Sequence, residues 1–157
     1  MQVLIAEDDP ISRKLLELNL GRNGYHVVSA TDGGQAWGAL SREGAPKLAI
    51  LDWMMPVMDG TEVCRRVRAD PSLSYVYLIL LTAKSETEDT VAGMEAGADD
   101  FLSKPFDRNE LRVRLRAGER VIELERSLAR QNEKLSEGEQ ATLKEMAELD
   151  LARQTRT

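Results

Sequence analysis

The sequence lacks the long apolar runs, the paired cysteines and the basic surplus that each mark a particular class of protein. No run approaches the roughly 18 apolar residues that a membrane-spanning helix needs, and residues 1–7 do not begin a secretory signal. The single cysteine, Cys64, excludes an intramolecular disulfide. A net charge of −6 argues against a nucleic-acid groove, because phosphate contacts need clustered Lys and Arg. These absences predict a soluble, cytoplasmic protein that binds neither membrane nor nucleic acid.

Aromatic residues are also scarce, at 4%, but 42% of the residues are hydrophobic, which is enough for a core. Short apolar runs with turn residues beside them are expected to form strands, at 3–6, 26–29, 48–51, 76–81 and 100–102. Longer amphipathic stretches are expected to form helices between them, at 10–22, 34–43, 59–69 and 87–96. Connections this short imply right-handed crossovers. The order therefore predicts an α/β sandwich with one parallel sheet and helices on both faces.

The composition changes after Asp107. Residues 108–157 contain no proline and are dominated by Glu, Arg, Leu, Ala and Gln, which favours one continuous helix. Apolar residues at heptad spacing are Val121, Leu124, Leu128 and Leu135. Met146 follows eleven residues after Leu135, and this spacing indicates a four-residue stutter in the heptad pattern.

Such a helix needs a partner, because isolated helices are marginal in water and Gly138 costs about 1 kcal/mol relative to alanine. A parallel coiled-coil homodimer is the preferred interpretation, and a solvated single helix is the alternative. We therefore expect one α/β domain at residues 1–121 and a helical extension at residues 122–157.

Carboxylates follow the first and third expected strands, as Glu7-Asp8-Asp9 and as Asp52. Those two strands should be neighbours where the strand order reverses, so the carboxylates should meet at one edge of the sheet. Carboxylates about 5 Å apart repel by on the order of 3 kcal/mol per pair at an effective dielectric near 20. A divalent cation such as Mg²⁺ would remove that cost. The acidic run alone could equally serve a helix N-terminus, but its combination with Asp52 favours a metal site.

Thr82 and Lys104 follow the fourth and fifth expected strands. Either residue alone is more typical of a turn or of a solvated surface. If Asp52 attacked a phosphorus atom, however, the equatorial oxygens would need a cation, a hydroxyl donor and a fixed positive charge. Mg²⁺, Thr82 and Lys104 fit these three roles, so the set predicts phosphoryl transfer to Asp52.

Four segments, LIAEDDP, AILDWMMPVMDG, LILLTAK and GADDFLSKPF, make residues 1–121 resemble the receiver domain of two-component response regulators. The resemblance implies a flavodoxin-like (βα)5 sandwich with sheet order 2-1-3-4-5. It implies that Asp52 is the phosphoacceptor. It also implies that Mg²⁺ is held by Asp8, Asp52 and the backbone carbonyl of Met54, with Glu7 acting through water and Asp9 less suited as a ligand.

The same resemblance assigns further roles. Thr82 and Lys104 correspond to the hydroxyl and the lysine that contact the phosphoryl group, and Phe101 corresponds to an aromatic residue that switches together with Thr82. The switch would act on the face formed by the fourth helix, fifth strand and fifth helix. Met54 and Lys84 occupy the positions that tune phosphoryl lifetime, and neither is a carboxylate or amide, so self-dephosphorylation should be slow. The Lys104-Pro105 bond is expected to be cis.

The resemblance implies a signalling phosphoacceptor that catalyses only its own phosphorylation and slow dephosphorylation, with a sensor histidine kinase or phosphotransfer protein as donor. Two alternatives are an interaction module that is not phosphorylated and a hydrolase with Asp52 as nucleophile. The stretch RVIELERSLARQNEKL resembles linkers that precede cyclase or phosphatase outputs. The sequence has no helix-turn-helix, cyclase motif or P-loop. It is therefore interpreted as part of a longer regulator, or as one that works by dimerisation.

Overall fold

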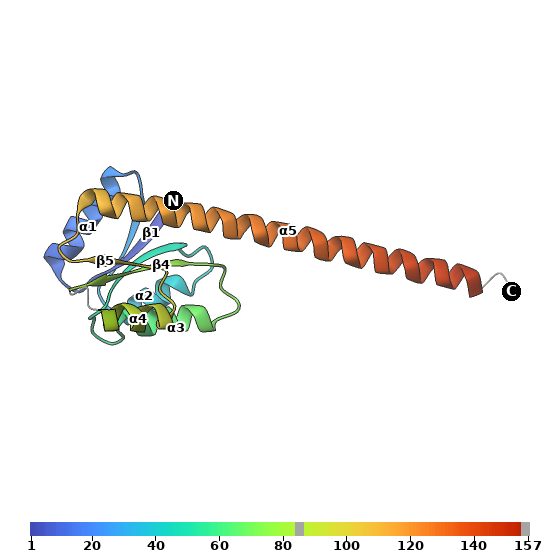
Figure 1. The fold of residues 1–157 in the computed structure, drawn as a ribbon, viewed down its shortest axis with the longest axis horizontal. Coiled ribbons are helices and arrows are strands. Elements are labelled where there is room, and N and C mark those ends of the chain that lie inside the picture. The colour runs from blue at the N-terminus through green and yellow to red at the C-terminus, as the bar shows by residue number, and fades with distance from the viewer. Residues whose placement is uncertain (84–86, 155–157) are drawn as a thin grey trace. The chain divides into compact units, whose positions relative to one another are not determined.

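Strands and helices alternate along the chain (Figure 1). The computed structural model describes residues 1–83 and 87–154. The strands are β1 (Gln2–Ala6), β2 (His26–Ala30), β3 (Leu48–Asp52), β4 (Tyr77–Thr82) and β5 (Asp100–Ser103). The helices are α1 (Pro10–Arg22), α2 (Gly33–Leu40), α3 (Gly60–Ala69), α4 (Thr87–Ala96) and α5 (Arg108–Gln154).

The five strands form one parallel sheet in the order β2-β1-β3-β4-β5. This arrangement confirms the predicted fold class and sheet order. The order reverses between β1 and β3, where Ala6 pairs with Leu51. Asp52 pairs with Leu81 on β4, so the carboxyl ends of these central strands are aligned. An edge of this kind, at the point of reversal, is where parallel sheets bind ligands.

Helices cover both faces of the sheet, with α1 and the first part of α5 on one face and α2, α3 and α4 on the other (Figure 1). All five residues of β3 are buried, and its side chains alternate between the two cores. Leu48 and Ile50 pack with residues of α1 and α5, whereas Ala49 and Leu51 pack with residues of α2 and α3. This burial on both faces explains why the strand reads as an unbroken apolar run.

Aspartates fix where three helices begin. Asp9, Asp32 and Asp59 each accept a hydrogen bond from the backbone N–H three residues later, at 2.8 to 2.9 Å. Such caps satisfy backbone donors that the first helical turn leaves free. The helix that was predicted at 34–43 instead ends at Leu40. A turn follows, in which Ala45 N–H bonds to the carbonyl of Arg42 and Gly44 has a φ of +72°.

Helix α5 is continuous from Arg108 to Gln154, which confirms the predicted helix over that range; residues 155–157 lie outside the described part. By its internal contacts, the chain divides into Met1–Ile122 and Glu123–Thr157. Val121 was expected among the heptad-spaced apolar residues that face the partner helix of a coiled coil. It is instead half-buried against the core of the first unit. Within residues 1–83 and 87–154, no helix is long and apolar enough to cross a membrane.

Candidate functional site

Three carboxylates gather at the carboxyl edge of the sheet. Glu7 follows β1, Asp8 comes next, and Asp52 is the last residue of β3. One oxygen from each lies within 4.8 Å of the others. Glu7 and Asp52 are buried, with 1% and 8% of their surface exposed, whereas Asp8 is exposed to solvent. The cluster therefore has two fixed members and one that water can reach.

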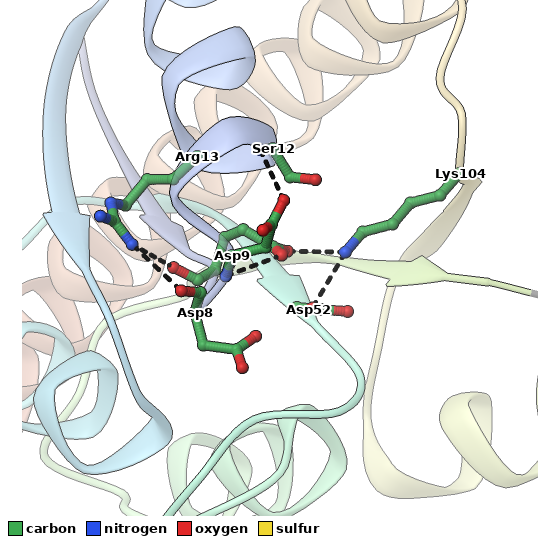
Figure 2. Close-up of polar contacts among 7 residues, drawn as sticks. Asp8, Asp9, Ser12, Arg13, Asp52 and Lys104 are labelled. Carbon is green, nitrogen blue, oxygen red and sulfur yellow. Dashed lines mark hydrogen bonds and ion pairs between the residues drawn. The ribbon is translucent and has the colours of Figure 1, made fainter.

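Lys104 binds two of these carboxylates at once (Figure 2). Its ammonium nitrogen Nζ lies 2.8 Å from Glu7 Oε2 and 2.9 Å from Asp52 Oδ2. Burial lowers the pKa of Lys104, but the hydrogen bonds to Glu7 and Asp52 outweigh this effect and leave the pKa above its ordinary value. Lys104 therefore carries a positive charge beside Asp52 at neutral pH.

The cluster holds more negative charge than Lys104 neutralises. Burial, followed by the hydrogen bond with the Asp52 side chain, raises the pKa of Glu7 from 4.5 to about 7. Glu7 is thus only partly ionised near neutral pH, as expected where like charges share a buried site. Mg²⁺ prefers carboxylate oxygens and retains several waters, and the two buried carboxylates with the exposed Asp8 provide such a donor set. The residues present fit the predicted metal.

Asp9 does not belong to this donor set. Its side chain caps α1, accepting the N–H of Ser12 at 2.9 Å, and that hydrogen bond lowers its pKa. Arg13 was not predicted from the sequence, and its guanidinium donates to the backbone carbonyls of Glu7 at 3.0 Å and Asp8 at 3.5 Å (Figure 2). Side chains in the first turn of a helix point back toward the preceding loop, and this rule could have identified Arg13.

The remaining predicted residues are Thr82, Met54, Lys84 and Phe101. Thr82 is buried at the end of β4, and its carbonyl accepts the N–H of Lys104 at 2.8 Å across the sheet. Met54 lies two residues after Asp52 with 74% of its surface exposed, and Lys84 falls outside the described residues. Phe101, on β5, is half-buried, and its ring lies against Gly93 of α4. The Lys104-Pro105 bond is cis, as expected.

The loop after Asp52 contains a strained residue, because Val57 has a φ of +72°. Left-handed backbone costs an L-residue about 1 to 2 kcal/mol, and β-branching makes it worse. With 83% of Val57 exposed, its side chain recovers little of that cost. Val57→Gly should therefore raise the free energy of unfolding by about 1 kcal/mol, measured by urea denaturation.

A matched variant, Val57→Ala, keeps the β-carbon and should recover less stability than glycine does. If Val57→Gly were destabilising, the strain at this position would not be a cost to the fold.

The chain matches the model of the response regulator receiver domain over residues 3–116. A probable transcriptional regulator, ycf27 from Guillardia theta, is 45% identical over 116 residues, which cover 74% of this chain and 44% of the relative. The chain spans about half the length of the curated relatives it matches.

Solved structures give the same family. A putative response regulator from Chloroflexus aurantiacus J-10-fl aligns with a TM-score of 0.70 and 36% identity, over 74% of this chain and 95% of the other. The receiver domain of the sensor histidine kinase PA1611 from Pseudomonas aeruginosa PAO1 aligns with a TM-score of 0.67 and 34% identity, over 77% and 96%. That receiver has a magnesium ion coordinated in its active site cleft. From the matched residues 3–116 and these relatives, the chain belongs to the response regulator receiver domain family.

Proposed function

We propose that this receiver takes a phosphoryl group on Asp52 from the phosphohistidine of a sensor histidine kinase or phosphotransfer protein. The observation that carries the proposal is the single ammonium group of Lys104 in contact with both Glu7 and Asp52. In the transfer, a carboxylate oxygen of Asp52 bonds to phosphorus while the phosphorus–nitrogen bond to histidine breaks. The imidazole nitrogen of the donor keeps the electron pair of the broken bond.

Each residue of the site would have a separate role in the phosphoryl transfer. Asp52 is held at the end of β3 by pairing with Leu81, which fixes the nucleophile. Lys104 would exchange contacts with Glu7 for contacts with a phosphoryl oxygen, and the Thr82 hydroxyl would donate to another. Asp8, Asp52 and the Met54 carbonyl would hold Mg²⁺, with Glu7 acting through water. When bound, Mg²⁺ supplies positive charge against the phosphoryl oxygens. The likeness to the magnesium-bound PA1611 receiver supports this assignment.

A small phosphodonor such as acetyl phosphate tests the proposal without a kinase. With Mg²⁺, the wild-type chain should gain one phosphoryl group by intact-mass spectrometry, as an acid-stable and base-labile adduct. Asp52→Asn should gain none. An unmodified wild type would favour the interaction module. Continuous phosphodonor consumption without an adduct would favour the hydrolase. The adduct should persist for much longer than seconds, because neither Met54 nor Lys84 can position a hydrolytic water well.

Thr82 and Phe101 are proposed to couple the site to the α4-β5-α5 face. If Thr82 moves toward a phosphoryl group, Phe101 can turn into the vacated space and change how β5 meets α4. The same strand is tied to α5 by Arg114, whose guanidinium donates to Asp100 at 2.6 Å. Beryllofluoride with Mg²⁺ should therefore shift the NMR signals of both Thr82 and Phe101. Unchanged signals at Phe101, with beryllofluoride bound, would contradict the coupling.

We assign residues 1–121 to the receiver and residues 122–157 to a helical extension that passes the change to an output domain or to a second copy. The continuous helix α5 supports this assignment because it leads out of the receiver without a break. Dimerisation through that helix is the favoured form of output.

A further inference from the structure

Helix α5 carries large exposed apolar side chains beyond the receiver core, and some of them form a stripe along one face of the helix. Its large apolar side chains there have 53% to 66% of their surface exposed, and they are Leu124, Leu128, Leu135, Leu143, Met146, Leu149 and Leu151. Four of them, Leu124, Leu128, Leu135 and Leu149, lie on the a and d positions of one heptad frame that has Leu128 at a. A stripe of this kind needs a covering surface, and its heptad spacing suits another helix.

The charged residues at the e and g positions, beside the stripe, distinguish a parallel from an antiparallel pair of helices. In a parallel, in-register pair of helices, each g position faces the e position five residues later on the other copy. On α5, the charged pairs in this frame are Arg120–Glu125, Lys134–Glu139 and Glu148–Arg153, and each joins opposite signs. The other two pairs, Ser127–Asn132 and Ala141–Met146, carry no charge. An antiparallel pair would bring g to g and e to e, and would lose this complementarity.

We propose that residues 120–153 of α5 bind the same segment of a second copy, parallel and in register. The inference rests on the dimeric output in the proposed function and adds the register of the two helices and the residues that pair between them. Because the charge pairs keep one frame through Arg153, the heptad continues past Leu135. The stutter that Met146 suggested is therefore not used in the pairing.

The contact between the two helices is formed by the a and d positions, and it is weakest in the middle of the segment. Gly138 and Glu145 occupy d positions there, and an added β-carbon at Gly138 would meet nothing within 4 Å. A surface hollow at this point is lined by residues that include Leu135, Gly138, Glu139 and Thr142. These four residues occupy heptad positions a, d, e and the next a. In a parallel coiled coil, the residues at these positions form the hole into which a d side chain of the facing helix packs. In register, the facing residue is again glycine, so the hollow stays unfilled and Gly138→Leu should tighten the dimer.

Sedimentation equilibrium of the full chain tests the pairing. Wild type should dimerise reversibly, and Leu128→Asp should be monomeric. Lys134→Glu or Glu139→Lys turns two attractive pairs per dimer into repulsive ones and should weaken association about tenfold. The double variant, and an equimolar mixture of the two single variants, should both regain wild-type affinity. Lys144→Glu, at an outer position of the same helix, controls for the change in net charge.

Three results would overturn the proposal: a monomeric wild type, single charge variants that dimerise as the wild type does, or a double variant and mixture that stay weak. Phosphorylation of Asp52 is measured on the same samples. A chain that is phosphorylated but fails these tests refutes the paired helix alone. If the chain dimerises as expected but is not phosphorylated, the phosphoacceptor function is refuted and the helix pairing still holds.

Discussion

Lys104→Met should cost the fold about 2 kcal/mol without divalent cations and slow phosphorylation from a small phosphodonor by roughly 100-fold. Removing the ammonium leaves the buried Glu7 and the adjacent Asp52 without the cation that lies 2.8 and 2.9 Å from them. An uncompensated buried charge is strongly destabilising. Protonation of Glu7 limits the loss, because its pKa is already raised to about 7. The slower reaction follows from losing the fixed positive charge beside the phosphoryl oxygens.

Urea unfolding at pH 8, with and without Mg²⁺, measures the first part of this prediction. Mg²⁺ should restore more stability to Lys104→Met than to the wild type, because the cation replaces the missing positive charge. The control is Lys14→Met, since the Lys14 side chain is 70% exposed and lies 3.9 Å from Glu17, so its loss should change stability little. Equal effects of the two substitutions would show that Lys104 is not a buried counter-ion.

Gly33→Ala should destabilise the protein by about 3 kcal/mol. Gly33 is the first residue of α2, and its N–H donates to the carbonyl of Pro56 at 3.3 Å in the loop after Asp52. A β-carbon at Gly33 would overlap the carbonyl oxygen of Met58. A side chain could rotate away, but this contact is with backbone, so the loop itself must move. The substitution should therefore also slow phosphorylation of Asp52.

Gly38→Ala provides the matched control on the same helix. A β-carbon at Gly38 meets nothing within 4 Å, so alanine should stabilise α2 by about 1 kcal/mol through helix propensity alone. Thermal and urea unfolding of both variants measure the difference. Similar stabilities for the two would contradict the close packing of α2 on the loop after Asp52.

The sequence predicted the core elements well because the central strands β1, β3 and β4 are apolar on both faces. The run before Asp52 has no polar residue that could interrupt a buried strand, and its alternate residues do pack into two cores. The end of α2 was predicted less well, because Arg42 and Glu43 favour helix while the turn that displaces them depends on Gly44. Val121 was misassigned for a similar reason. Heptad spacing does not distinguish a residue that packs on its own domain from one that faces a second helix.

The carboxylate cluster was predictable because parallel strands that adjoin at a reversal of order end at the same edge. Asp8 and Asp52 therefore meet although they are far apart in the sequence. The double contact of Lys104 with Glu7 and Asp52 was not predictable, since it depends on side-chain conformation as well as on register. The close approach of Gly33 to Met58 was missed for the same reason: it depends on how two loops pack.

Reduction of the phosphorylated protein tests, at the level of a single residue, whether the phosphoryl group is on Asp52. Borohydride converts an aspartyl phosphate to homoserine, which peptide mass spectrometry can locate. After reaction with acetyl phosphate and Mg²⁺, we expect homoserine at position 52 alone and none in protein that was not phosphorylated. Homoserine at position 8 or at another carboxylate, with Asp52 unchanged, would show that Asp52 is not the phosphoacceptor.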